Sequence, residues 1–405
     1  MSEEDNKTLR EQERQSEPRV RPAWRALVQD FEPLWFTECM NAGIIAILLH
    51  QLPYQFPGLG ILSIIAFMID FLFFIVFSLT MLTRFALYTR QAYWEITDNV
   101  QQLAQMACWT IAWLTLAALV NLIVSQAGWG GHAFTIVGYV MWWFGAAWSI
   151  LTLLFVFIII IRRQKGEAEG GQLPPMILLP IVSIATTATT GGLIACYSAG
   201  ISARMAVPVI IVSFLYVGIG MFMATFMYTL LLHKLLTTGF PAPMQIASMF
   251  LFVGPMGQSA AALQLLASAA STYGRFGGYS QGIFLQASAA TPLNAACVLL
   301  ALLLTGMATV WAFLALFAML EKAFNKNLSW SPTWNSIIFP LGTLTTSTLQ
   351  LSIEMDSPAW RTITTALVII LVIMFFINLG FTTWNIIQGK LLIVKENPRV
   401  EEKSE

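Results

Sequence analysis

Hydroxyl, amide and proline residues recur inside long apolar segments of this sequence. One segment holds Ser183, Thr187 and Thr190 at i+4 and i+3 spacing, so a helix would place all three on one face. Two further segments contain Gly254-Pro255-Met256-Gly257-Gln258-Ser259 and Phe339-Pro340-Leu341-Gly342-Thr343. Neutral hydroxyl and amide donors hold an anion weakly and at several points, which suits passage rather than retention. Gln258, Ser259, Thr187, Thr190 and Thr343 are therefore the candidate donors.

The sequence contains no pattern typical of an enzyme. Its three histidines lie near the ends of apolar segments, and no GxxxxGK[ST] loop is present to bind a nucleotide. The four cysteines form no CxxC motif, so neither a disulfide framework nor a metal site is indicated. We expect no catalytic activity, cofactor, metal or nucleic-acid partner, and any transport must then follow existing gradients.

Composition places the chain in a membrane. Of its 405 residues 57% are hydrophobic and 10% are charged, and the mean hydropathy is +0.71. A helix needs about 20 apolar residues to cross a bilayer. The sequence predicts an all-α polytopic protein with ten spans, at 33–50, 59–81, 99–125, 133–161, 174–196, 206–232, 242–270, 290–320, 333–353 and 359–386.

The basic residues predict the orientation of the spans. Loops after even spans carry eight Lys and Arg, whereas loops after odd spans carry three. This difference places both termini in the cytoplasm. Residues 1–30 are expected to be a disordered cytoplasmic tail, 31–390 the membrane domain and 391–405 a second cytoplasmic tail. Basic loops and the N-termini of the odd spans then lie together, so we expect the inner mouth to attract anions.

The ten spans form five predicted hairpins whose two members differ. Even spans consist mostly of large apolar residues, whereas odd spans carry Asn, Thr, Gly and Pro. Pro180, Pro255 and Pro340 should each remove a helical hydrogen bond to the carbonyl four residues earlier. Irregular backbone at membrane depth is tolerated only inside protein or beside water. Odd spans are therefore expected to surround a path, although small residues could instead only permit close packing.

Two carboxylates lie within predicted spans, Asp70 and Glu38. An intramembrane acid is a functional candidate by default, so Asp70 could relay protons in a coupled transporter. Its place on an even, outer span instead favours a structural role with hydrogen bonds to its own helix. Glu38 lies near the start of span 1, where it could face water.

Several short motifs resemble the tellurite-resistance/dicarboxylate transporter family, which includes plant slow anion channels, malic acid transporters and fungal sulfite efflux pumps. They include the Trp334 to Pro340 segment of span 9, Pro33-Leu34-Trp35-Phe36 of span 1 and Leu232-His233-Lys234-Leu235 ahead of span 7. The last of these is most similar to the sulfite efflux branch. Span 3 departs from that branch because Gln105 to Thr110 contains no Gly or Pro, and we expect this helix to be straighter.

The resemblance implies a fold and a gate. Family members have five hairpins with quasi-fivefold symmetry around a central pore and commonly form homotrimers. A phenylalanine of span 9 closes the pore of the anion channels, and Phe339 holds the matching position. The resulting hypothesis is a plasma-membrane exporter or channel for small anions, with sulfite the first choice. The alternatives are a proton-coupled carrier of C4-dicarboxylates such as malate, and a membrane sensor without transport.

Overall fold

The computed structural model describes residues 23–163, 173–388 and 391. Helices make up nearly all of this part of the chain, and it contains no β-strand. Nine helical segments of the described residues are long and apolar enough to cross a membrane. The prediction of an all-α polytopic membrane protein is therefore confirmed. The segment around α14 is less apolar than these nine, and that it forms a tenth span stays a prediction.

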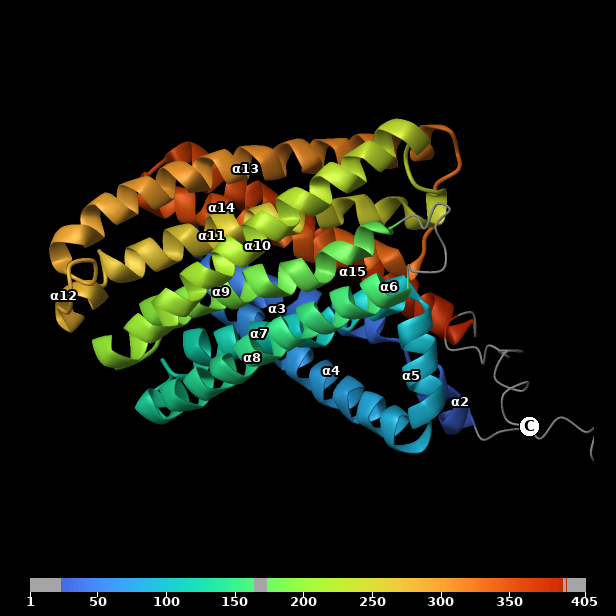
Figure 1. Cartoon of the computed structure of the whole chain (residues 1–405), viewed down its shortest axis with the longest axis horizontal. Coiled ribbons are helices and arrows are strands. Elements are labelled where there is room, and N and C mark those ends of the chain that lie inside the picture. Colours follow the sequence, from blue (N-terminus) through green and yellow to red (C-terminus); the bar gives the residue numbers. More distant parts are fainter. Residues whose placement is uncertain (1–22, 164–172, 389–390, 392–405) are drawn as a thin grey trace, which may run out of the picture.

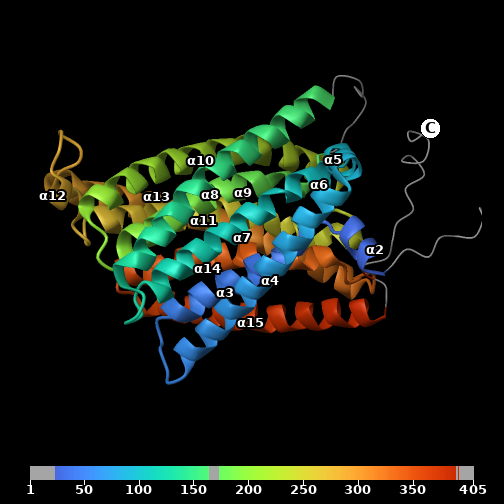
Figure 2. The same cartoon turned by 90° about the horizontal axis from the view of Figure 1, so that it is seen from below.

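Two sets of long helices alternate along the chain. The first set is α3 (Phe36–Gln51), α7 (Ala107–Leu119), α9 (Leu179–Tyr197), α11 (Val253–Ala270) and α14 (Asn335–Glu354). The second set is α4 (Leu59–Leu87), α8 (Gly131–Arg163), α10 (Ala203–Thr238), α13 (Ala287–Phe324) and α15 (Pro358–Ile387). They lie side by side along the long axis of the molecule (Figures 1 and 2).

Burial separates the inner set from the outer set. We compare the share of buried residues in the most apolar 18 residues of each span. This share is 100% in the spans that contain α9 and α11, and 78% in those that contain α3 and α7. In the outer spans this share is only 28% to 39%. An exposed face of Leu, Ile and Phe is stable only against lipid, so the predicted division into inner odd spans and outer even spans is confirmed.

The inner helices form a closed ring. Along the ring α3 packs against α7, α7 against α9, α9 against α11, α11 against α14, and α14 back against α3. Each inner helix also packs against the outer helix that follows it in the chain, which gives the five expected hairpins. The ring therefore encloses one axis, to which all five inner helices contribute. Quasi-fivefold symmetry of the hairpins stays a prediction.

Most inner helices begin with a short 3₁₀ segment that opens on proline. These segments are η1 (Pro33–Trp35), η3 (Pro175–Leu178), η4 (Pro243–Phe252) and η5 (Pro332–Trp334). Pro180 and Pro255 lie in the first turn of α9 and α11, directly after the 3₁₀ segments η3 and η4 of the same spans. Pro255 thus lies well inside its span, close to a change from 3₁₀ to α-helix, and Pro340 lies inside α14. That these prolines shape the path stays a prediction.

The third span is not straighter than its counterparts. It is divided into α6 (Val100–Gln105) and α7 by a turn at Met106. Its last turn, η2 (Val120–Val124), is a π-helix. The Asn99 side chain accepts hydrogen bonds from the amides of Gln101 and Gln102 and so caps α6. The absence of Gly and Pro therefore did not keep this span regular, and the expectation was wrong.

Glycines allow the inner helices to approach one another closely. A methyl group on Gly342 would lie 2.7 Å from Ile44 of α3, and one on Gly254 would lie 2.8 Å from Val182 of α9. One on Gly192 would lie 2.7 Å from the Leu265 side chain of α11. For these glycines the close-packing interpretation is the correct one.

Short helices mark the two ends of the bundle. Helices α2 (Ala23–Gln29), α5 (Thr89–Asp98) and α6 lie at the end where the inner helices begin, and α12 (Arg275–Tyr279) lies at the other (Figure 1). Helix α2 packs on α4 and lies before the expected domain boundary at residue 31, and the division into tails and membrane domain stays a prediction. Residues 1–22 and 392–405 lie outside the described residues.

Candidate functional site: an axial path inside the helix ring

A large cavity opens at the end of the bundle where the inner helices begin. Its volume is about 950 Å³, and we call it the vestibule. Its walls come from the segment before α3, from α5 and the start of α6, from η4 and η5, and from the ends of α4 and α15. Asn335, the first residue of α14, also lines it.

Most of the charged residues that line the vestibule are acids. Its carboxylates are Asp30, Glu32, Glu38, Glu95 and Asp98. Arg84 is the only Lys or Arg among the described residues that line it. The described vestibule wall thus contradicts the expectation of a basic inner mouth, because the basic loop residues do not face this cavity.

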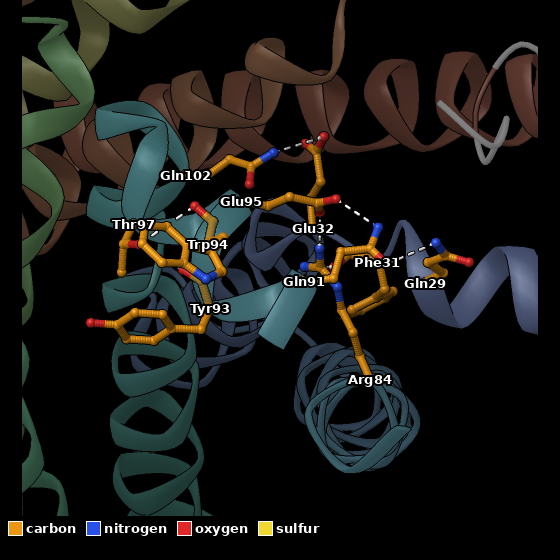
Figure 3. Close-up of polar contacts among 10 residues, drawn as sticks. All are labelled: Gln29, Phe31, Glu32, Arg84, Gln91, Tyr93, Trp94, Glu95, Thr97 and Gln102. Atoms are coloured by element: carbon orange, nitrogen blue, oxygen red, sulfur yellow. Dashed lines mark hydrogen bonds and ion pairs between the residues drawn. The ribbon is translucent and has the colours of Figure 1, made fainter. Parts of the chain in front are cut away.

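Arg84 is held by groups around it and is not free to receive an anion. Its side chain is 2% exposed, Nη2 lies 2.5 Å from Glu95 Oε2, and Nη1 donates to the Phe31 carbonyl at 2.8 Å. Glu95 also accepts a hydrogen bond from Gln91 on the same helix, at 2.7 Å. Figure 3 shows this cluster joining α4, α5 and the segment before α3. The positive charge of Arg84 is therefore neutralised locally.

A buried polar network lies between the vestibule and the axis. Asn335 Nδ2 donates to Glu38 Oε1 at 2.7 Å, and Thr382 Oγ1 of α15 donates to the same oxygen at 3.3 Å. Asn41 Nδ2 donates to the side chain and backbone carbonyl oxygens of Asn335 at 3.3 and 3.2 Å. Glu38 Oε2 finds no hydrogen-bond donor among the described residues, although the side chain is only 3% exposed. The network joins α3, α14 and α15.

A second and much smaller cavity lies on the axis of the ring. Its volume is about 20 Å³, enough for about one water molecule. We call it the axial space, and it is lined by Ile44, Ile47, Thr115, Thr186, Thr189, Thr190, Leu193, Gln258 and Thr346. These residues come from all five inner helices. Because the vestibule and the axial space are separate, side chains between them must move before an ion can pass.

The polar groups around the axial space are neutral, and their donors are already hydrogen-bonded, whereas Gln258 Oε1 has no partner among the described residues. The Thr186 and Thr346 hydroxyls donate to carbonyls one turn earlier in their own helices, at 2.8 and 2.9 Å. Gln258 Nε2 donates to Thr186 Oγ1 at 3.0 Å, and Thr189 Oγ1 donates to the Gln258 carbonyl at 2.9 Å. A hydroxyl that turns to an anion would give up one such bond, which costs about 1 kcal/mol.

Phe339 lies on α14 between the two cavities. It is four residues after Asn335, which lines the vestibule, and seven before Thr346, which lines the axial space. The helical period places these three residues on one face of α14. Phe339 is 2% exposed, and it is followed by Pro340, whose carbonyl accepts a hydrogen bond from Thr343 Oγ1 at 2.6 Å.

Among the predicted path residues, only Thr190 and Gln258 line the axial space. Thr187 faces α8, because its hydroxyl donates to Ser149 Oγ at 3.0 Å. Thr343 packs on α11, because its hydroxyl oxygen occupies the space that a methyl group on Gly257 of α11 would need. Gly254 packs against α9, whereas Pro255 and Ser259 are buried within α11 and line neither cavity.

The axis carries residues that the sequence analysis missed. In α9 they are Thr186 and Thr189. Of the predicted face, Thr187 is turned toward α8, whereas Thr190 does line the axial space. Threonine occupies both faces of this helix, so spacing alone could not select one. Thr346 had a clearer signal, because it follows Asn335 by three helical turns, with Phe339 between them.

Asp70 points into the protein although α4 is an outer helix. Its side chain is fully buried, and neither carboxylate oxygen accepts a hydrogen bond from the described residues. A methyl group on Gly43 would lie 2.6 Å from Asp70 Oδ2 and 2.8 Å from Thr115 Oγ1. Thr115 lines the axial space, so Asp70 lies close behind the axis. The expectation that its carboxylate bonds to its own helix is not met.

The fold and the site together define a class of protein. An apolar outer surface, a ring of inner helices and uncharged polar groups along one enclosed axis are typical of an integral membrane protein that moves small solutes. The chain belongs to the SLAC1 family of voltage-dependent anion channels, which it matches over residues 30–383. This is a family of anion transporters and channels and not of enzymes, as expected from the sequence.

Individual members of known function are also similar to this chain. The chain is 26% identical to the sulfite efflux pump SSU1 of Trichophyton rubrum over 384 residues, which cover 90% of this chain and 93% of the relative. It is 27% identical to that of Arthroderma benhamiae over 368 residues, with the same coverage. It is also 22% identical to the malic acid transport protein of Schizosaccharomyces pombe over 329 residues, 81% of this chain and 72% of the relative.

Proposed function

We propose that this protein is a plasma-membrane efflux transporter or channel for small anions, with sulfite the principal substrate. Anions would enter at the vestibule, pass Phe339, and cross the axial space by facilitated diffusion. The observation that carries the proposal is the axial space itself, to which all five inner helices contribute uncharged polar or apolar groups. Sulfite is chosen because the relatives that match most of this chain are named sulfite efflux pumps.

The direction of transport follows from the proposed orientation. With both termini in the cytoplasm, as the distribution of basic residues predicts, the vestibule faces the cell interior. An inside-negative potential then drives an anion outward by about 2.3 kcal/mol per charge at 100 mV. No coupling ion is needed for export. We also propose a homo-oligomer, and a trimer in particular, which light scattering of the purified protein would test.

Phe339 is proposed to be the gate. On α14 it lies between Asn335, which lines the vestibule, and Thr346, which lines the axial space, and this position supports a ring that turns aside when an ion passes. Phe339→Ala should therefore raise sulfite and nitrate flux into proteoliposomes by about tenfold or more, equivalent to about 1.4 kcal/mol of barrier. Phe252→Ala is the matched control, because Phe252 is equally buried but packs against Tyr228 and Trp311 at the outer helices. Equal flux in the two variants would contradict the assignment of Phe339 as the gate.

A proton-coupled carrier of C4-dicarboxylates is the second candidate. It is supported by Asp70, a fully buried carboxylate without hydrogen bonds beside a residue of the axial space, and by the similarity to a malic acid transport protein. An acid that has no hydrogen-bond donor among the described residues and lines neither cavity is expected to be neutral at rest, since an unpaired charge is very costly inside a membrane. It could then exchange its proton during transport.

Malate flux separates the two candidates. A carrier that uses Asp70 would move malate only with a pH gradient, and Asp70→Asn would abolish this dependence. Asp356→Asn is a suitable control, because that aspartate is exposed at the end of α14. Sulfite flux that follows voltage, ignores the pH gradient and survives Asp70→Asn would favour the passive exporter.

A further inference from the structure

We propose that Glu38 makes the path selective for singly charged anions and excludes doubly charged ones. This inference rests on the proposed function and adds to it the charge of the transported species. The relevant site is the inner end of the vestibule, where the Glu38 carboxylate and Asn335 lie at the start of α14. An oxyacid that ionises twice would then cross only in its singly charged form.

The Glu38 side chain is fixed in position by its neighbours. Asn335 of α14 and Thr382 of α15 both donate to Oε1, and Asn41 holds Asn335 in turn. Oε2 is left without a donor among the described residues, in a side chain that is almost completely buried yet lines the vestibule. A purely structural carboxylate would be expected to have both oxygens hydrogen-bonded. The free oxygen therefore points to a role toward the contents of the vestibule.

Glu38 also lies beside the route to the axis. It bonds to Asn335, and Phe339 follows Asn335 by one helical turn on the same face of α14. An anion that leaves the vestibule toward Phe339 must pass this carboxylate. The one cation of the described vestibule wall, Arg84, does not offset it, because its guanidinium is committed to Glu95 and the Phe31 carbonyl.

Repulsion by a fixed carboxylate increases with the charge of the passing ion. At about 6 Å and an effective dielectric constant of about 20, each unit of negative charge lowers occupancy by about a hundredfold. A doubly charged anion is therefore disfavoured by about a hundredfold relative to a singly charged one of similar size.

Nitrate, chloride and sulfate flux test the inference. Purified protein in proteoliposomes is compared at neutral pH and fixed voltage, where these ions keep a constant charge. The wild type should move nitrate about a hundredfold or more faster than sulfate, and Glu38→Gln should lower this ratio by about tenfold or more, because it raises sulfate flux more than nitrate flux. Glu38→Asp, which keeps the charge, should keep the selectivity.

Two further variants make the test specific. Glu354→Gln is the matched control, because Glu354 lies at the opposite end of α14 and is also bonded to an asparagine, Asn294. It should leave the ratio unchanged. Thr382→Lys leaves Glu38 in place but sets a cation beside it, so it should lower the ratio even if Glu38→Gln fails to fold.

The outcomes separate the two hypotheses. An unchanged nitrate to sulfate ratio in a Glu38→Gln variant that still conducts nitrate would overturn the role of Glu38 and leave the anion path intact. The same holds for an unchanged ratio in Thr382→Lys. Failure of the wild type to move nitrate or chloride would overturn both this inference and the proposed function.

Discussion

The contact between α11 and α14 depends on the absence of a side chain at Gly257. A methyl group there would lie 2.8 Å from the Leu344 amide nitrogen and closer still to Thr343 Oγ1. The amide belongs to the backbone of α14, so it cannot turn away as the end of a flexible side chain could. Gly257→Ala would therefore force the two helices apart.

The size of the effect can be worked out from two opposing contributions. Overpacking a well-packed interior typically costs about 1–3 kcal/mol. Replacing Gly by Ala within a helix gains about 1 kcal/mol from backbone propensity. Gly306→Ala on α13 provides the second contribution alone, because no atom lies within 4 Å of its added methyl group. The difference in the free energy of unfolding between the two variants therefore isolates the steric cost at Gly257. We expect this difference to be about 1–3 kcal/mol.

Thermal unfolding in detergent, followed by tryptophan fluorescence, measures this difference. Gly306→Ala should be as stable as the wild type or more stable, and Gly257→Ala should have a Tm several degrees below that of Gly306→Ala. If the two variants unfold at the same temperature, α11 and α14 do not touch at Gly257. The close-packed ring described above would then be wrong at this contact.

Two further substitutions, each with an exposed control, test polar contacts of the bundle. Arg84→Met should destabilise the protein by about 3 kcal/mol, because it leaves a largely buried Glu95 without its cation; Arg361→Met, which breaks an exposed ion pair, should cost less than about 1 kcal/mol in the same unfolding assay. Trp142→Phe should lower the free energy of unfolding by about 1 kcal/mol or more, because the buried indole N–H of Trp142 donates to a carbonyl of α9 at 2.9 Å. Trp129→Phe, at a 74% exposed position, should change the free energy of unfolding by less than about 0.5 kcal/mol.

Much of the architecture could be predicted because membrane burial leaves a strong compositional signal. Long apolar runs identified the spans, and the contrast between span types identified the inner helices. The direction of a single side chain depends instead on packing. Asp70 shows this limit: it lies on an outer helix, as expected, but the space left by Gly43 of α3 lets its carboxylate point inward.

The candidate site was less predictable than the fold for two physical reasons. Small residues serve equally to line a path and to let helices touch, so Gly254 and Thr343 were assigned to the path although they pack between helices. The charge of the vestibule was also hidden. Its acids come from segments far apart in the sequence, such as Glu38 and Glu95, and a count of charges per loop cannot show which side chains face the same cavity.

The packing of the ring also bears on how the path could open. At Gly257 the helix α11 touches the backbone of α14, and at Gly342 the helix α14 lies against the Ile44 side chain of α3, so moving a whole helix would disturb close contacts. The side chain of Phe339, which precedes Thr346 of the axial space on the same face of α14, can instead turn about single bonds. Side-chain rotation therefore needs less rearrangement than separation of the helices. For this reason we expect the gate to be a side chain, with Phe339 the residue placed to act as one.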